Sequence, residues 1–213
     1  MKKSLKRYTD LPFLLDYLST KKLALLNPKT WDDTNDSHYI NVYVQSKNYD
    51  SAYALCLTEA NETYHHWKVF TTGSSGVCIE FYKDTLLNHI GKLPELRAQS
   101  VQYKTIGKIK NQPPGEEQLP FLKHWAFRDE REFRIFFSAK GVVAPIYQFV
   151  VPGNAIKKII LSPWIPAAVA EKVKDSINAM AGCKSLRVSQ SSLIDNEKWK
   201  QFAFVAKKAA NDV

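Results

Sequence analysis

The sequence has few cysteines and no long apolar segment. Its three cysteines, Cys56, Cys78 and Cys183, are odd in number and far apart, which argues against a disulfide framework or a zinc site and is typical of reduced thiols in a cytosolic protein. No apolar run approaches the roughly 20 residues that a membrane-spanning helix needs. The basic N-terminus lacks the uninterrupted apolar stretch of a signal peptide. We therefore expect a soluble, cytoplasmic protein with no membrane partner.

Several catalytic signatures are also missing. The chain contains no glycine-rich phosphate loop, no G-x-G-x-x-G motif, no H-E-x-x-H motif and no nucleophile elbow. The G-S-S-G segment at residues 73–76 is typical of a turn and not of a catalytic serine. Asp32, Asp33 and Asp36 lie close together but lack the spacing of a calcium loop, and adjacent acids of this kind more often cap turns than bind metal.

Basic residues outnumber acidic ones. The chain has 30 lysines and arginines against 21 aspartates and glutamates, a formal net charge of +9. This excess favours a polyanionic partner such as nucleic acid. Small basic clusters are spread along the chain at Lys2–Lys6–Arg7, Lys104–Lys108–Lys110, Lys157–Lys158 and Lys198–Lys200–Lys207–Lys208. Each cluster alone is typical of a solvated face, but their sum predicts attraction to phosphate backbones at low salt.

Apolar patterns predict more strands than helices. Strands are expected at residues 5–8, 23–26, 40–44, 53–57, 77–81, near 100–103, around 132, 146–151, 158–161 and 186–188. Helices are expected at 11–18, 64–70 and 83–91 and after Pro166, and a loop at Gly107–Leu119. Because strands and helices rarely alternate, we expect a single α+β domain over residues 1–213, with a mainly antiparallel or mixed central sheet and a few short helices. Its core is expected at about residues 5–190, followed by a basic C-terminal tail.

The segment Arg128–Phe137, R-D-E-R-E-F-R-I-F-F, carries the strongest chemical signal. As one strand with a period of two, it would separate a polar face from an apolar face, with Arg128, Glu130, Glu132 and Arg134 on the first and Phe133, Ile135 and Phe137 on the second. Two carboxylates one strand step apart could bind a sugar hydroxyl while a nearby cation binds phosphate. A half-buried strand with a ladder of surface ion pairs would produce the same pattern.

Four short blocks occur in a suggestive order. They are L-K-R-Y at Leu5–Tyr8, N-P-K-T-W-D-D-T-N-D at Asn27–Asp36, C-L-T with H-W-K-V-F and G-V-C-I-E-F between Cys56 and Phe81, and E-R-E-F-R at Glu130–Arg134. This order resembles a bacterial family known only as domain of unknown function 2971. The family usually has Phe-Asn-Asp-Pro-Phe-Glu where residues 31–36 read Trp-Asp-Asp-Thr-Asn-Asp, so the resemblance is to a divergent member. It covers roughly residues 5–165 and implies no established chemistry.

The layout also resembles the ADP-ribosyltransferase superfamily. Those enzymes begin with a strand carrying His or Arg, continue with a short helix and a second strand, and place the catalytic Glu on a late strand, often as E-x-E. Here Arg7 precedes the helix expected at 11–18, and Glu130-Arg131-Glu132 supplies E-x-E. The chain has no clear Ser-Thr-Ser motif, and its opening strand reads R-Y-T where many relatives read H-G-T. The resemblance implies an ADP-ribosyltransferase-like fold and an enzyme that uses NAD.

Roles for individual residues follow from that resemblance. Glu132 is expected to stabilise the oxocarbenium-like centre that forms when the nicotinamide–ribose bond breaks, and Glu130 to orient or deprotonate the nucleophile. The other expected roles are an anchor for the pyrophosphate or ribose at Arg7 and an aromatic flank for the nicotinamide at Tyr8, Tyr64 or Trp67. The acceptor is expected to be a macromolecule, RNA or DNA above all. By analogy, such an enzyme would suit a bacterial toxin or phage-defence effector, which leaves room for a cognate inhibitor protein.

Two other functions fit the same residues. One is a non-enzymatic nucleic-acid-binding module that stacks bases on Trp67, Trp125 and Tyr103. The other is a metal-dependent nuclease whose magnesium ligands would be Asp32, Asp33, Glu130 and Glu132. The transferase requires NAD and Glu132 but no metal, the nuclease requires magnesium, and the binding module requires neither.

Overall fold

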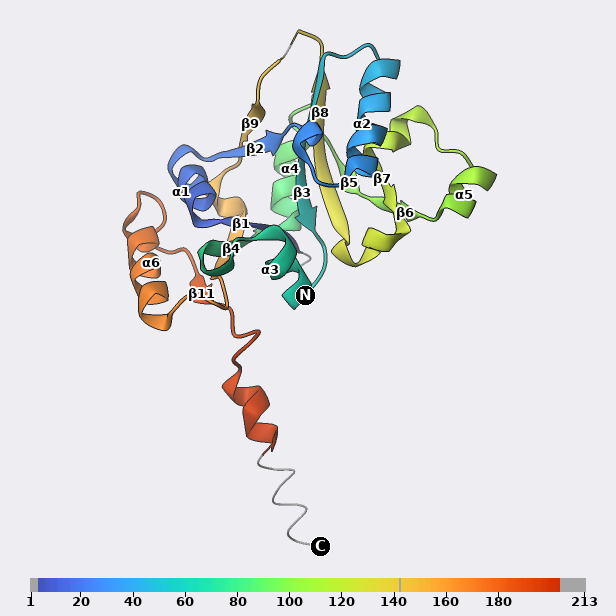
Figure 1. Cartoon of the computed structure of the whole chain (residues 1–213). Coiled ribbons are helices and arrows are strands. Elements are labelled where there is room, and N and C mark those ends of the chain that lie inside the picture. Colours follow the sequence, from blue (N-terminus) through green and yellow to red (C-terminus); the bar gives the residue numbers. More distant parts are fainter. Residues whose placement is uncertain (1–3, 142, 204–213) are drawn as a thin grey trace, which may run out of the picture.

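A mixed, mostly antiparallel sheet organises the chain in the computed structural model, which describes residues 4–141 and 143–203 (Figure 1). Within those residues the sheet contains nine strands, β1 (Ser4–Asp10), β2 (Lys22–Leu26), β3 (Ser51–Thr58), β4 (Gly76–Tyr82), β5 (Arg97–Ser100), β8 (Glu132–Ala139), β9 (Ile146–Val150), β10 (Ile156–Leu161) and β11 (Val188–Gln190). Two short parallel strands, β6 (Gln102–Lys104) and β7 (Leu122–His124), form a separate pair. The predicted α+β class and sheet type are confirmed.

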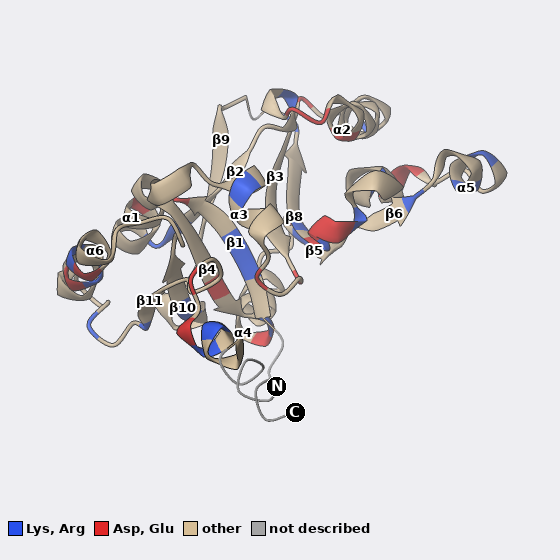
Figure 2. Ribbon diagram, turned by 60° about the horizontal axis from the view of Figure 1, so that its bottom comes forward, with Lys and Arg blue, Asp and Glu red and all other residues tan. Residues whose placement is uncertain are grey.

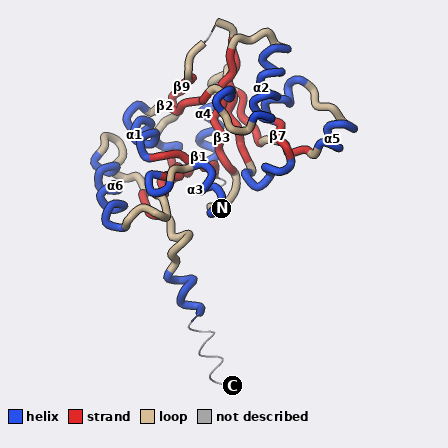
Figure 3. The backbone as a smooth tube through the Cα atoms, viewed as in Figure 1, coloured by secondary structure: helices blue, strands red, loops and turns tan. Residues whose placement is uncertain are grey.

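Helices lie around this sheet and also beyond it, next to the β6–β7 pair (Figure 3). They are α1 (Leu11–Thr20), α2 (Thr34–Ser46), α3 (Tyr64–Phe70), α4 (Lys83–Ile90), α5 (Ile106–Asn111) and α6 (Ala167–Ala179). Short 3-10 turns lie at η1 (Pro28–Thr30), η2 (Gly73–Ser75), η3 (Glu116–Phe121), η4 (Trp125–Glu130) and η5 (Gly153–Ala155). Helices α5 and α6 lie at opposite ends of the molecule (Figure 2). No helix in the described part of the chain combines the length and the apolar composition needed to cross a membrane.

Strand β3 is fully paired along one edge and only sparsely paired along the other. Along the first edge it pairs with β8 over its whole length, from Ser51↔Ala139 to Thr58↔Glu132. Along the second edge it pairs with β2 near its start, at Ala54, and with β1 at its end, through the single pair Lys6↔Thr58. Strand β1, by contrast, pairs with β4 over its full length. We call the place where β1 and β3 part the seam.

Strand β8 confirms the predicted alternation of its side chains. Phe133, Ile135 and Phe137 are buried in the main apolar core, together with residues of α1, α4, α6 and most strands. The opposite face carries Glu132 and Arg134, and α2 and β7 cover it. Those polar side chains are buried, so they are not the solvated ion-pair ladder that the pattern also allowed.

The sequence pattern placed the segment around Glu130 in the same strand, but in the structure this segment lies outside it. Residues Trp125–Glu130 form a 3-10 turn, Arg131 has a left-handed backbone with φ of 44°, and β8 starts only at Glu132. Arg128, predicted on the same face as Glu132, is exposed and lies over Trp125 instead. The local turn thus overrides the period of two.

The strand predicted at 40–44 is also wrong, because this segment belongs to helix α2. Asp33 caps the helix by accepting hydrogen bonds from the backbone N–H groups of Asn35 and Asp36. A strand would place residues 40, 42 and 44 on one face. In the helix, Ile40 and Tyr43 point inward to a small core with Phe136, while Val42 is 38% exposed.

Three smaller predictions also need correction. The loop expected at 107–119 contains most of α5 and part of η3, and Thr105 caps α5 by accepting from the N–H of Lys108. The strand expected near 100–103 is split into β5 and β6, and the one expected at 186–188 begins at Val188. Of the predicted C-terminal tail, residues 197–203 are helical and 204–213 lie outside the described part.

Candidate active site

A cleft of about 420 Å³ opens beside the seam. Strands β1 and β3, the start of α2 with the loop before it, α3, and the β7–η4 region all contribute to its wall. The residues that line it are Lys6, Arg7, Tyr8, Thr30, Trp31, Asp32, Asp33, Asp36, Cys56, Leu57, Thr58, His66, Val69, Phe70, Lys123, Phe127, Glu130 and Glu132. Arg7 and Glu132, separated by 125 positions in the sequence, therefore share one cavity.

Arg134 does not itself line the cleft but pairs with two of the carboxylates that do. Its guanidinium is fully buried and donates through Nη1 and Nη2 to the two oxygens of Asp36, at 2.9 and 2.6 Å. Nε and Nη2 also donate to the two oxygens of Glu132, at 2.7 and 3.0 Å, and Nη1 donates to the carbonyl oxygen of Pro120. All five N–H donors are thus used, which is what a buried guanidinium requires.

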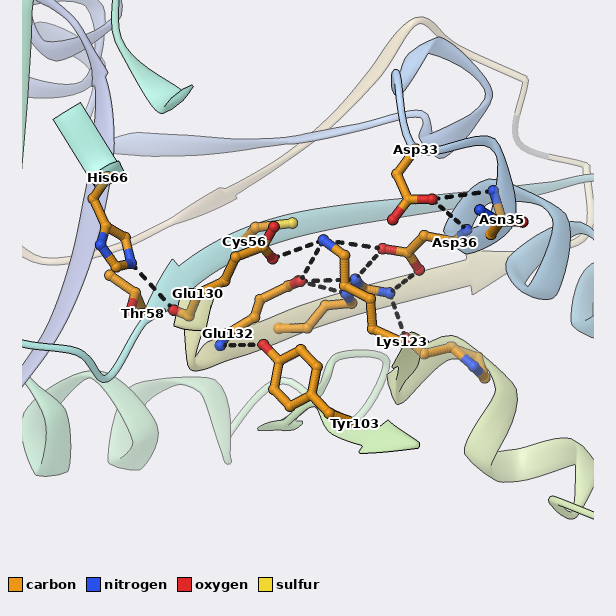
Figure 4. A network of polar contacts seen from close by, with 12 residues as sticks. Asp33, Asn35, Asp36, Cys56, Thr58, His66, Tyr103, Lys123, Glu130 and Glu132 are labelled. Carbon is orange, nitrogen blue, oxygen red and sulfur yellow. Dashed lines mark hydrogen bonds and ion pairs between the residues drawn. The ribbon is translucent and has the colours of Figure 1, made fainter. Parts of the chain in front are cut away.

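Lys123 supplies a second cation to the same group (Figure 4). Its Nζ lies 2.7 Å from Glu130 Oε2, 3.5 Å from Glu132 Oε2 and 3.7 Å from Asp36 Oδ2. Phe127 covers the ammonium at 4.8 Å. Three carboxylates against Lys123 and Arg134 give this acidic cluster a formal charge of −1 when all are ionised.

The environment separates the pKa values of the three carboxyls. Burial by itself would raise the pKa of Glu132, but Arg134 and then Lys123 outweigh it and lower the pKa to about 2. Burial raises the pKa of Glu130 above its usual value despite Lys123, and raises that of Asp36 despite Arg134. Glu132 is therefore a fixed negative charge, whereas Glu130 keeps its proton to a higher pH than an ordinary glutamate.

Glu130 is also the more available carboxylate. Its Oε2 accepts from Lys123, while Oε1 has no hydrogen-bond partner in the described part of the chain and remains in contact with solvent. The backbone carbonyl of Glu130 is held in place by Thr58 Oγ1, at 2.5 Å, and by His66 Nε2, at 3.3 Å. Glu130 combines a raised pKa, a free oxygen and a fixed backbone, which are the properties of a general base.

His66 is held as a neutral imidazole. Because a carbonyl oxygen can only accept, Nε2 carries the proton that bonds to Glu130, and Nδ1 accepts from the Thr63 hydroxyl at 2.6 Å. Burial lowers the pKa of His66, which agrees with this tautomer. Its ring stacks on Tyr8, with ring centroids 5.3 Å apart. His66 thus positions the Glu130 backbone.

Arg7 lines the same cleft from strand β1. Its Nη1 donates to the carbonyl oxygen of Cys56 at 3.0 Å, which bridges β1 and β3 where their backbone pairing has ended. Among the described residues it has no carboxylate partner within 4 Å, and its other guanidinium nitrogens have no hydrogen bond but stay accessible. Burial lowers the pKa of Arg7, whereas the nearby Cys56 and Glu132 raise it. A largely desolvated cation without an ion pair of its own favours an anionic ligand.

The predicted site residues divide into two groups. Glu132, Glu130, Arg7 and Tyr8 all line the cleft, although the Tyr8 hydroxyl is buried away from it. Tyr64 and Trp67 do not line it. Tyr64 is 53% exposed and packs edge-on against Trp164, and Trp67 is 0% exposed with its indole N–H donated to Glu62. The burial of Trp67 removes it as a nicotinamide flank and as a base-stacking platform.

The nuclease alternative loses its support at these carboxylates. Asp32 lines the cleft and is exposed, and Asp33 uses Oδ1 to cap α2. Across residues 4–141 and 143–203, no three His, Cys, Asp or Glu side chains form a group that could hold a metal ion. Glu130 and Glu132 are matched to protein cations, and Asp33 to backbone N–H groups.

Sequence reasoning missed several residues of the site. Trp31 lies 5.0 Å from the Arg134 guanidinium and lines the cleft, as does Phe127. Arg134 was placed correctly on the polar face of the strand, but its pairing with Asp36 depends on the fold. Lys123 and Phe127 carried no signal in the sequence, since only the tertiary fold brings the β7–η4 region beside Glu132.

No protein-family model matches the chain, and no curated protein sequence matches it significantly.

Proposed function

We propose that the protein transfers ADP-ribose from NAD to a macromolecular acceptor. The observation that carries this proposal is that one cleft holds both an unpaired cation and a cluster of carboxylates. Arg7, which forms no ion pair among the described residues, lines the same cleft as the acidic cluster of Asp36, Glu130 and Glu132. NAD has a matching polarity, with an anionic pyrophosphate and a ribose that develops positive charge as nicotinamide leaves.

The residues present fit this substrate. The guanidinium of Arg7 has free donors for pyrophosphate oxygens, which it can bind in a forked geometry. Trp31 and Phe127 line the cleft and offer aromatic surface for a planar base, whereas the ring of Tyr8 is buried against His66 and Trp67. A volume of about 420 Å³ is within the range of small-molecule sites. Trp31 and Phe127 replace Tyr64 and Trp67 as candidates for the aromatic flank.

The two glutamates have separate roles in the proposed reaction. The bond between ribose C1′ and the nicotinamide nitrogen breaks, and its electron pair leaves with nicotinamide. Glu132, ionised because its pKa is about 2, stabilises the positive charge on the ribose. A lone pair of the acceptor forms the new bond to C1′, and Glu130 Oε1 takes the proton that the acceptor loses. The products are nicotinamide, the ADP-ribosylated acceptor and one proton on Glu130.

The sequence pattern adds an independent argument. The order of Arg7 on an opening strand, a short helix and a late E-x-E resembles the ADP-ribosyltransferase superfamily. Cys56, Leu57 and Thr58 of β3 line the cleft between the Arg and the Glu, in the middle position where many relatives carry Ser-Thr-Ser. An ADP-ribosyltransferase-like fold belongs to this proposal and not to the description of the sheet.

Radiolabelled NAD tests the proposal directly. The wild-type chain is incubated with NAD and, separately, with RNA, DNA and protein pools, and label transfer and nicotinamide release are measured. Glu132→Gln is expected to reduce turnover at least about a hundredfold, because removing one such electrostatic contact costs on the order of 3 kcal/mol in the transition state. Glu171→Gln, an exposed substitution on α6, is the matched control and should not change turnover.

Two results would overturn the proposal. One is a wild-type chain that consumes no NAD with any acceptor pool. The other is a Glu132→Gln variant that is folded by circular dichroism and still turns NAD over at the wild-type rate. Arg7→Ala provides a further check, because it should raise the KM for NAD more than it lowers kcat.

A further inference from the structure

A second cavity, of about 390 Å³, lies on the arm that carries α5. It is lined by polar and basic side chains, namely Gln102, Tyr103, Lys104, Lys108, Asn111 and Gln112. We call residues 102–112, together with Trp125 and Arg128 of η4, the basic arm. Figure 2 shows α5 with its basic residues at the end of the molecule far from α6.

The positive charge of this arm is not neutralised by the protein. Residues 102–115 contain three lysines and no acid. In the described part of the chain, Lys104, Lys108, Lys110 and Arg128 form no ion pair. Other basic clusters are matched, since Lys157 and Lys158 both pair with Glu80.

An aromatic platform lies within the same patch. Trp125 is 43% exposed, with the Lys108 ammonium 5.9 Å and the Arg128 guanidinium 5.1 Å from its ring. Single-stranded nucleic acid is bound by this combination, because bases stack on an aromatic face while cations hold the phosphates. A base arriving on Trp125 would free Lys108 to contact phosphate. The amides of Gln102, Asn111 and Gln112 offer hydrogen bonds to base edges.

The arm is connected directly to the cleft. In the β6–β7 pair, Tyr103 of the arm lies opposite Lys123 of the acidic cluster. The Tyr103 hydroxyl also accepts the backbone N–H of Glu132 at 2.7 Å. A nucleic-acid strand bound along the arm would therefore end beside the carboxylates.

We infer that the basic arm binds single-stranded nucleic acid, with phosphates against Lys104, Lys108 and Lys110 and a base on Trp125. This inference depends on the proposed function only in making the bound strand the acceptor for ADP-ribose; the binding itself does not depend on it.

The test measures fluorescence anisotropy of a labelled oligouridylate with the full chain over a range of salt. The arm variant is Lys104→Gln/Lys108→Gln/Lys110→Gln. Its matched control, Lys172→Gln/Lys174→Gln/Lys184→Gln, removes the same charge from α6 and the loop after it. The arm variant is expected to bind at least about tenfold more weakly and to lower the slope of log Kd against log salt by about two to three, whereas the control keeps the wild-type slope. Trp125→Ala is expected to weaken binding on the order of tenfold with the slope unchanged.

Equal losses in the arm and control variants would overturn the inference, because net charge alone would then explain binding. Competition by polyglutamate as strong as that by unlabelled oligouridylate would likewise overturn it in favour of an acidic protein partner. Arm variants should retain NAD hydrolysis measured without acceptor. If the wild type consumes no NAD, and the arm variant but not the control variant loses binding to oligouridylate, the binding inference stands and the proposed transferase fails.

Discussion

Arg134 is the residue on which the acidic cluster depends. It contacts both Asp36 and Glu132 with paired hydrogen bonds, and it has no exposure to solvent. Arg134→Met is expected to destabilise the protein by about 3–5 kcal/mol, because two buried carboxylates lose their counterion. Chemical denaturation measures this change.

Replacing Asp36 and Glu132 by neutral residues provides the control for this prediction. Adding Asp36→Asn and Glu132→Gln to Arg134→Met removes the uncompensated charges together with the arginine, so the triple variant is expected to be more stable than Arg134→Met alone. A triple variant less stable than the single one would contradict the ion-pair account of the cluster.

The pKa of Glu132 predicts a specific pH dependence of stability. Its pKa is lowered from 4.5 in the unfolded chain to about 2 in the folded protein. The ionised carboxylate therefore contributes stability that is fully present above about pH 4.5 and is lost as the pH falls toward about 2. The difference in unfolding free energy between wild type and Glu132→Gln should shrink over that window. Equilibrium unfolding at successive pH values would reveal a constant difference if this linkage were absent.

Glu130 has the opposite shift, and its consequence is in activity. Because burial raises its pKa, the proton-accepting form is lost at a pH above the ordinary range of a glutamate. The acid limb of kcat/KM for transfer is expected to report this raised pKa and to disappear in Glu130→Gln. Transfer to the acceptor should fall more in this variant than NAD hydrolysis does, which nicotinamide release and label transfer measure separately.

At the scale of elements, helix α2 brings Asp36 to the cluster, and its cap fixes where the helix starts. Asp33→Ala removes a side chain that accepts two backbone N–H groups, so a loss of about 1 kcal/mol is expected. Asp33→Ser should retain most of the stability. Asp32→Ala is the neighbouring control, and a comparable loss there in thermal unfolding would show that the cap is not responsible.

The turn between α3 and β4 is closely packed at Gly76. A Cβ at this position would lie 2.5 Å from Thr71 Oγ1 and 2.7 Å from Thr71 Cβ. Gly76→Ala is therefore expected to cost about 1–3 kcal/mol. Gly107 in α5 has open space around it, so Gly107→Ala should be neutral or stabilising by up to about 1 kcal/mol. Urea denaturation of the two variants distinguishes a steric clash from a general effect of alanine.

The elements also show what sequence patterns can and cannot predict. Apolar alternation correctly predicted the two faces of β8, because Phe133, Ile135 and Phe137 obey a local period. It failed at 40–44, where β-branched residues suggested a strand but the Asp33 cap and the inward Ile40 and Tyr43 make a helix. It failed again at Glu130, where the left-handed Arg131 interrupts the period.

For the site, the sequence could group residues only by type. Arg7, Glu130 and Glu132 were selected for their chemistry, and the fold brings them into one cleft. Lys123 and Phe127 depend on the packing of the β7–η4 region, and Trp67 looked accessible until its burial was seen. Tertiary placement, which no local period encodes, accounts for these differences.

At the scale of the whole molecule, the C-terminal third completes the sheet. Strand β10 pairs with β4 and buries Ile159 and Leu161, whereas residues 195–203 are exposed. Truncation after Pro152 is expected to abolish cooperative unfolding, because the edge of β4 and the apolar core would be uncovered. Truncation after Ile194 should leave the melting temperature within about 2 °C of wild type. Circular dichroism of both truncations decides between these outcomes.

The cleft joins Arg7 from the start of the chain to the late residues Lys123, Glu130 and Glu132, and this has a consequence during synthesis. A nascent chain that has left the ribosome only as far as β3 contains Arg7 but not yet Lys123, Glu130 or Glu132. Because translation proceeds at about 5–20 residues per second, seconds pass between the emergence of Arg7 and of Glu132. If the cleft is an active site, the protein is inert while it is being made.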